Sequence, residues 1–149
     1  MRAAVVAVIL IAAAGALAAA RGSPLALTIT AEDGQRLWAL PVRPGDEVVL
    51  VYTHSIYLAP VEEHLRVRPD GFRLTEVRSP SEAVLAYNAL HGPYRRVAGR
   101  YVAPASARLT ELVIRIGRTG RQRLIVGGTA LPLYTAGEGA RLRIAVRAR

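Results

Sequence analysis

The side chains best suited to chemistry lie close together between Tyr52 and His64. The run Tyr52-Thr53-His54-Ser55 is followed, after a short apolar stretch, by Pro60-Val61-Glu62-Glu63-His64, which places two of the three histidines, two acids and a serine within thirteen residues. Imidazole, carboxyl and hydroxyl groups of this kind bind ligands, hold metals or transfer protons. Polar groups on a half-buried sheet cost free energy unless they are hydrogen-bonded. The cluster is therefore either a hydrogen-bonded structural pair or a functional site.

The spacing of these residues favours a β-hairpin with its turn at residues 57–60. In that register His54 faces Glu63 directly, with Tyr52 on the same, more apolar face. A slip of one residue would move the two members of the pair to different faces. The candidate site residues, whether they bind a ligand or hold the fold, are His54, Glu63, Ser55 and Tyr52.

Four interpretations of this hairpin can be compared. A metal site would combine His54, Glu63 and His64, but the expected register puts the two histidines on opposite faces, and the chain has no cysteine. A serine nucleophile is disfavoured because Ser55 and His54 are adjacent in a strand and point apart, and no G-x-S-x-G motif is present. A ligand pocket and a structural polar pair remain. We therefore expect no catalytic residue, no metal and no other cofactor.

Short segments of alternating or continuous apolar residues predict the strands that position the hairpin. Pro132 cannot donate to a β-ladder, which places its strand at a sheet edge. We expect an all-β fold, a β-sandwich or partly open barrel of about eight or nine mostly antiparallel strands. The predicted strands are residues 25–30, 36–42, 47–56, 61–68, 72–77, 112–116, 121–126, 130–135 and 141–147.

One short helix is predicted after the strand at residues 72–77. Ser79-Pro80-Ser81-Glu82 has the pattern of a capping box with proline at the first helical position. Helix formers with one apolar stripe follow at residues 83–90, and Gly92-Pro93 ends them. We expect this helix to cover one end of a sheet.

The N-terminus has the composition of an export signal. A single arginine precedes an apolar run, residues 3–20, in which Ala18 and Ala20 supply the small side chains that signal peptidase requires. An uncleaved membrane anchor is the alternative, because an apolar run of this length nearly spans a bilayer. Residues 1–20 are therefore expected to be a signal peptide or an N-terminal anchor, and residues 25–149 a single β-rich domain outside the cytoplasm.

The basic charge of the chain does not indicate a nucleic-acid partner. All 20 basic residues are arginines, and the formal net charge is +9. The arginines alternate along predicted strands, which is typical of a solvated sheet face. Aromatic residues, on which bases would stack, are not interleaved with them. Because cysteine is absent, packing and sheet hydrogen bonds must stabilise the domain.

The hairpin motif resembles the signature of an uncharacterised bacterial family, domain of unknown function 1850. The family pattern, Tyr/Trp-x-His-Ser and then Pro-Val-x-Glu, falls here on residues 52–55 and 60–63. Members look like small exported β-rich proteins, and many are similar to reading frames found beside TRAP-type transporters with TAXI solute-binding proteins. Many relatives carry a Gly-rich stretch where this chain has residues 78–83, the expected start of the helix.

The resemblance implies an envelope protein connected with solute uptake. We expect a non-catalytic accessory protein, periplasmic or otherwise extracytoplasmic, that contacts the membrane subunit or the solute-binding protein of a TRAP-type transporter. Its own contact with the membrane would be limited to the N-terminal segment. The alternative is a stand-alone periplasmic protein that binds a small ligand in a pocket around His54 and Glu63.

Overall fold

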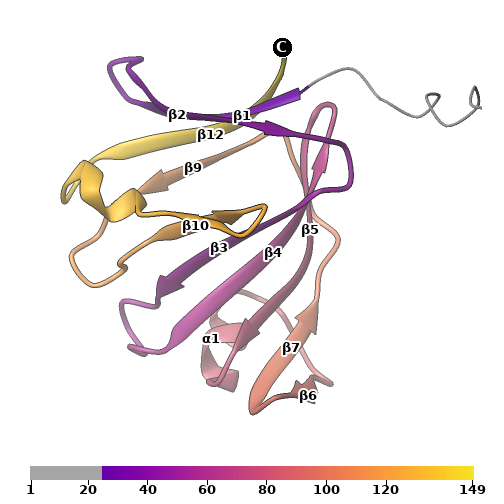
Figure 1. The fold of residues 1–149 in the computed structure, drawn as a ribbon. Coiled ribbons are helices and arrows are strands. Elements are labelled where there is room, and N and C mark those ends of the chain that lie inside the picture. The colour runs from indigo at the N-terminus through magenta and orange to yellow at the C-terminus, as the bar shows by residue number, and fades with distance from the viewer. Residues whose placement is uncertain (1–24) are drawn as a thin grey trace, which may run out of the picture.

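Two antiparallel β-sheets and a short helix make up the structure, a computed structural model that describes residues 25–149 (Figure 1). The four-stranded sheet has the order β2 (Arg36–Val42), β1 (Leu25–Ala31), β12 (Arg141–Ala148) and β9 (Glu111–Arg115). The eight-stranded sheet has the order β11 (Thr129–Leu131), β10 (Arg123–Val126), β3 (Glu47–Thr53), β4 (Pro60–Arg68), β5 (Gly71–Ser79), β7 (Arg100–Pro104) and β6 (Arg95–Val97), with β8 (Arg108–Leu109) paired to β5. The helices are α1 (Glu82–Tyr87) and a 3-10 helix (Leu133–Ala136).

The main core lies between the four-stranded sheet and the β10, β3 and β4 part of the eight-stranded sheet. Leu25, Leu27 and Ile29 of β1 are buried at alternate positions, as the period of two of a β-strand requires. Leu50 of β3 and Leu65 of β4 belong to the same buried cluster. Each sheet therefore buries one face against the other, which is the arrangement of a β-sandwich.

Helix α1 covers a second part of the eight-stranded sheet. Val84 and Leu85 of α1 are fully buried in a cluster with Val61 of β4, Val77 of β5 and Ala103 of β7. In Figure 1, α1 lies beside β4 and β5, away from the four-stranded sheet. The helix thus closes the end of the sheet that the sandwich leaves open.

The four-stranded sheet and helix α1 pack on the same face of the eight-stranded sheet. Alternate residues of a strand share a face, so Val61, Leu65 and Val67 of β4 point the same way. Val61 packs in the cluster under α1, whereas Leu65 and Val67 pack in the main core. We call this the inner face, and the opposite face, which carries Glu62 and His64, the outer face.

The structure confirms the predicted fold class, an antiparallel β-sandwich with one short helix. Within the described residues it has more strands than predicted, because residues 95–109 form the short strands β6, β7 and β8. Ala98 and Gly99 join β6 to β7 with positive φ values of 48° and 77°, which a tight hairpin turn requires. Strand β11 is an edge strand as predicted, although it ends before Pro132.

The start of the helix differs from the prediction. Ser79 belongs to β5 and is fully buried, and its Oγ accepts a hydrogen bond from the backbone N–H of Ser81 at 3.2 Å. Ser81 occupies the N-cap position and makes no side-chain cap bond, so the capping box does not form. Strand β5 is longer than predicted and includes Ser79, whereas Glu82 begins the helix, so the two residues of the predicted capping box belong to different elements.

The predicted signal or anchor, residues 1–20, lies outside the described residues. Between residues 25 and 149, no helix is long and apolar enough to cross a membrane.

Candidate functional site

Strands β3 and β4 form the hairpin that carries the polar motif. Their register places Leu50 opposite Glu63 and ends with Thr53 opposite Pro60. Residues 54–59 therefore form the connection, which is longer than the predicted turn. Relative to the predicted register the strands are displaced by an even number of residues. Strand side chains keep their predicted faces in such a displacement, but their direct partners change.

The predicted cross-strand pair of His54 with Glu63 is wrong. His54 lies in the turn, where its Nδ1 accepts hydrogen bonds from the backbone N–H groups of Ile56 and Tyr57, at 3.3 Å each. Side chains that hydrogen-bond to nearby backbone compete in this way with the ladder of a sheet. The imidazole that the sequence pattern assigned to the strand therefore caps the turn that ends it.

Tyr52 is the partner of Glu63. The Tyr52 hydroxyl donates a hydrogen bond to Oε1 of Glu63 at 2.8 Å, across a diagonal of β3 and β4 that a long aromatic side chain can span. Tyr52 packs against both the main core and the cluster under α1, so the pair lies where the two meet. Two of the four predicted site residues are thus in contact. The other two are not: His54 caps the turn, and Ser55 is exposed in it.

Burial dominates the electrostatics of this pair. It raises the pKa of the Glu63 carboxyl, and the hydrogen bond from Tyr52 acts in the opposite direction. Burial and then the neighbouring Glu63 carboxylate raise the pKa of the Tyr52 hydroxyl, while a hydrogen bond with Asn88 lowers it. Arginines pair with Glu62 and Glu76 on the outer face, but within residues 25–149 no cation pairs with Glu63.

A pocket of about 350 Å³ opens beside the pair. Leu50, Tyr52 and Glu63 of the inner face line one side. Residues 112–115 of β9, an edge strand of the four-stranded sheet, line the other side together with Gln122. The volume is at the lower end of the range for small-molecule sites.

Gln122 is the polar residue of this pocket that the sequence did not reveal. Its Nε2 donates to the backbone carbonyl of Arg115 at 3.3 Å. Its Oε1 is buried without a hydrogen-bond partner among the described residues. No motif surrounds Gln122, and it reaches the pocket of Glu63 only because the connection from β9 to β10 links the two sheets.

His54 organises an exposed apolar tip, which consists of Ile56, Tyr57, Leu58 and Tyr87. The centroid of the His54 ring lies 5.3 Å from that of Tyr57 and 4.9 Å from that of Tyr87, and the two tyrosine rings are 6.1 Å apart. The side chains of the tip are strongly exposed: Ile56 59%, Tyr57 45%, Leu58 67% and Tyr87 59%. Grouped exposed apolar residues are typical of interaction surfaces. His54 itself is buried and does not line the pocket beside Glu63.

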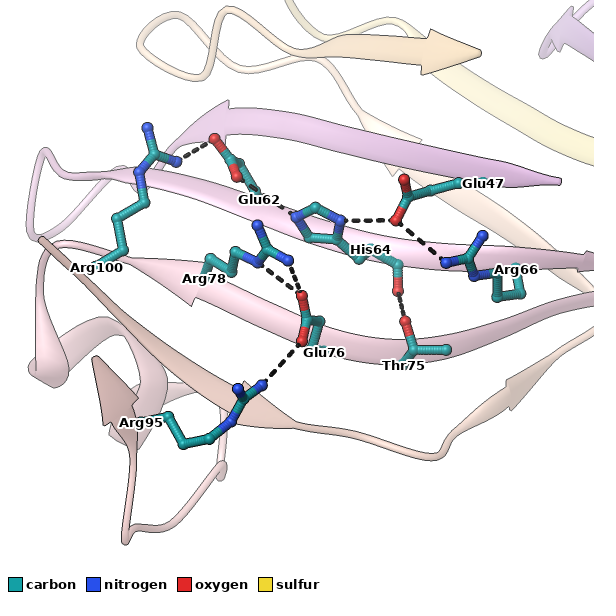
Figure 2. Close-up of polar contacts among 9 residues, drawn as sticks. All are labelled: Glu47, Glu62, His64, Arg66, Thr75, Glu76, Arg78, Arg95 and Arg100. Carbon is teal, nitrogen blue, oxygen red and sulfur yellow. Dashed lines mark hydrogen bonds and ion pairs between the residues drawn. The ribbon is translucent and has the colours of Figure 1, made fainter. Parts of the chain in front are cut away.

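His64 lies among ion pairs on the outer face (Figure 2). Its Nδ1 is 3.2 Å from Oε1 of Glu47, and its Nε2 is 3.4 Å from Oε2 of Glu62. Glu62 also pairs with Arg100 of β7, and Glu47 with Arg66 at 3.8 Å. These contacts tie β3, β4 and β7 together across the outer face. A second group on this face consists of Glu76, Arg78 and Arg95.

The structure separates the residues of the metal hypothesis. His54 lies in the turn, Glu63 on the inner face and His64 on the outer face. In the part of the chain from residue 25 to 149, no group of three or more histidines, cysteines or acids could hold a metal ion. The motif contributes instead to two surface features, the pocket beside Glu63 and the exposed apolar tip.

One family model matches the part of the chain that carries both features. No curated protein and no solved structure matches the chain. The model that matches is described as "Domain of unknown function (DUF1850)" and covers residues 48–133, more than half of the chain. This range contains the Tyr52–Glu63 pair, the apolar tip and Gln122. The chain therefore belongs to the family of the domain of unknown function 1850.

Proposed function

We propose that this protein is a non-catalytic accessory protein that works outside the cytoplasm and binds the membrane subunit of a TRAP-type solute uptake system. The observation that carries the proposal is the exposed apolar tip, which lies within the family match. The connection with TRAP transporters is drawn from the resemblance of family members to reading frames beside such transporters. The apolar run at residues 3–20 supports export.

The tip has the properties of a preorganised docking element. The hydrogen bonds from Ile56 and Tyr57 to the His54 ring hold the turn, and the backbone N–H of Leu58 donates to the His54 carbonyl at 2.8 Å. A loop held in its bound shape loses less entropy on binding than a free one. Aromatic side chains, here Tyr57 and Tyr87, are frequent anchors of protein interfaces. On this proposal the motif histidine shapes a contact surface rather than a reaction.

The test is co-purification of the full chain with a TRAP membrane subunit. The double variant Ile56→Ser, Leu58→Asn removes apolar area from the tip, and asparagine tolerates the positive φ of 50° at position 58. We expect this variant to bind at least about tenfold more weakly, since interface anchors typically contribute more than about 1 kcal/mol each. Val97→Ser, which changes a similarly exposed apolar residue on β6, is the control and should bind normally. Failure of the wild type to associate, or equal association of the tip variant, would contradict the proposal.

A second candidate function is small-ligand binding by the domain on its own. The pocket beside Tyr52 and Glu63 favours it, because apolar walls with a few converging polar groups are typical of ligand sites. A thermal-shift screen across a solute panel tests it. A ligand at a hundred times its dissociation constant adds about 2.7 kcal/mol to the free energy of unfolding. A panel without a single shift counts against this candidate and leaves the docking proposal intact.

A further inference from the structure

We propose that the pocket between β9 and the inner face binds a primary ammonium group carried on a short aliphatic chain. The inference rests on the second candidate function, ligand binding, and names the class of ligand. It follows from the hydrogen bonding of Glu63, from the lack of an ion pair to Glu63 within residues 25–149, and from the walls of the pocket.

The Glu63 carboxyl has unused hydrogen-bond acceptor positions in this pocket. The Glu63 carboxyl accepts one hydrogen bond, from Tyr52, whereas a carboxylate can accept several. The Tyr52 hydroxyl uses its only proton in that bond, and its oxygen already accepts from Asn88, so the open acceptor positions are those of Glu63. A ligand that satisfies these groups must bring N–H or O–H donors, and a primary ammonium brings three.

Gln122 contributes an amide with a fixed orientation to the wall of the pocket. Its Nε2 donates to the carbonyl of Arg115, so exchanging the two amide atoms would place oxygen against oxygen. Oε1 must therefore be the atom that is buried without a partner among the described residues. Because this oxygen has almost no accessible surface, the ammonium proposal rests on Glu63 and not on Gln122.

The charges of the hairpin favour an ammonium over a neutral donor. Glu62 pairs with Arg100 and Glu47 pairs with Arg66, both on the outer face. Glu63 faces the pocket and has no ion-pair partner within residues 25–149. Arg115 also lines the pocket, but it alternates with exposed Val113 on the face of β9 opposite to Leu112 and Ile114, and it makes no ion pair with Glu63. Burial without a counter-charge penalises its ionised form. A ligand cation would supply the missing charge and form charge-assisted hydrogen bonds.

The walls and the size define the rest of the ligand. Leu50 lines the pocket from the inner face, and Leu112 and Ile114 line it from β9. These side chains are aliphatic and offer an ammonium-bearing chain an apolar contact. A volume of about 350 Å³ suits a short chain rather than a drug-sized molecule.

Isothermal titration of the full chain with n-butylamine at neutral pH tests the proposal. n-Butanol and butyrate have the same chain with a neutral or an anionic head, and both should bind at least about tenfold more weakly than the amine. Glu63→Gln should weaken amine binding by at least about tenfold, since it removes the charge from the hydrogen bonds to the ammonium. Glutamine keeps the shape of the side chain and an acceptor for Tyr52, so this variant should fold, which its circular dichroism spectrum would verify.

Glu62→Gln is the matched control. It makes the same change of charge at the adjacent residue of the same strand, but on the outer face. It should bind the amine as the wild type does. Undiminished amine binding by Glu63→Gln overturns the proposal. Butanol or butyrate binding as tightly as the amine overturns the ammonium assignment and leaves ligand binding standing. If none of the three probes binds, the ammonium proposal is overturned. The second candidate function, ligand binding, would be rejected only if no compound of the solute panel shifted the melting temperature either.

Discussion

The Tyr52 hydroxyl allows a carboxyl to occupy the inner face of the sheet. A carboxylate at this position loses much of its hydration, which is unfavourable unless a donor replaces the water. The Tyr52 hydroxyl supplies that donor at 2.8 Å, and the raised pKa of the hydroxyl keeps its proton in place. A substitution of either residue should therefore change the hydrogen bonding of the other.

Tyr52→Phe removes this donor and should destabilise the domain by about 1–3 kcal/mol, because the Glu63 oxygen is left without its partner. Urea unfolding measures the effect. Tyr101→Phe is the control, since the Tyr101 hydroxyl makes no hydrogen bond within residues 25–149 while its ring packs in the cluster under α1. Equal losses in the two variants would contradict a special role of the Tyr52 hydroxyl.

Glu63 should make the stability of the domain depend on pH in an unusual direction. Its pKa is raised in the folded state, so the folded protein holds this proton more tightly than the unfolded chain. Stability is then highest below the unfolded pKa of this group and falls as the pH rises through the folded pKa. Glu63→Gln imitates the protonated form. It should raise the melting temperature at neutral pH, and the difference from the wild type should shrink in acid.

The control for this pH dependence is Glu62→Gln. The Glu62 carboxylate pairs with Arg100 and lies near His64, so its removal should not stabilise the protein at neutral pH. Thermal unfolding across the pH range measures both variants. A difference between Glu63→Gln and the wild type that stays constant with pH would show that Glu63 does not titrate differently in the two states.

The sequence predicted the faces of these residues better than their partners. Alternation placed Tyr52 and Glu63 on one face, and that held because the displacement of the strands is even. The partner of Glu63 was missed because His54 hydrogen-bonds to the backbone of its own turn. The apolar periodicity of a sequence does not indicate whether a histidine continues a strand or hydrogen-bonds to nearby backbone. Gln122 was missed because its place depends on how the two sheets pack.

Among the elements, strand β5 depends on a glycine at its first position. Gly71 has φ +135°, and a Cβ there would lie 2.2 Å from the carbonyl oxygen of Leu109 in β8. The pairing of β5 with β8 therefore requires a residue without a side chain at this point. No other residue can adopt the backbone and leave room for Leu109.

Gly71→Ala should therefore destabilise the domain by more than about 1 kcal/mol, because it adds a steric clash to the strain of a positive φ. Gly34→Ala is the control: Gly34 also has a positive φ, +87°, but a Cβ there meets no atom within 4 Å. Chemical denaturation of the two variants compares them. A loss for Gly71→Ala no larger than that for Gly34→Ala would mean that β8 moves away at little cost.

The long strands were predicted, whereas β6, β7 and β8 were not, for a physical reason. Strand β1 buries Leu25, Leu27 and Ile29, and β12 buries Leu142, Ile144 and Val146, so the period of two is visible in the sequence of these long strands. Strand β6 has three residues, all exposed, and β8 has two. Their pairing is decided by the turn at Ala98 and Gly99 and by the neighbouring β5, and not by apolar alternation.

At the scale of the whole molecule, two elements cover one face of the eight-stranded sheet. The four-stranded sheet and α1 both pack on the inner face, and Tyr52 and Leu74 contact both apolar clusters. Strands β3, β4 and β5 therefore connect the two clusters covalently and through shared hydrogen bonds. We expect the described domain to unfold as one cooperative unit.

Leu85→Ala in α1 and Ile144→Ala in β12 test this cooperativity. Both residues are fully buried, and each truncation should cost about 2–5 kcal/mol. Each variant should shift one common transition, followed by circular dichroism and by tryptophan fluorescence from Trp38 in β2. If Leu85→Ala altered the helix signal and left the Trp38 transition in place, the two halves would be independent.

The pairing of β1 with β12 determines how the domain would respond to force. Leu25 pairs with Ala148, so the two ends of the described chain leave from the same end of two neighbouring strands (Figure 1). A pull that separates these ends acts across the strands, along the hydrogen bonds of the antiparallel ladder, and loads them one after another. The hydrogen bonds between β1 and β12 would break one at a time from this end, instead of sharing the load as they would if the strands were pulled along their length. If the domain is held at its N-terminal side, traction on its C-terminus would open the ladder between β1 and β12 from Leu25 and Ala148 and expose the main core from that side.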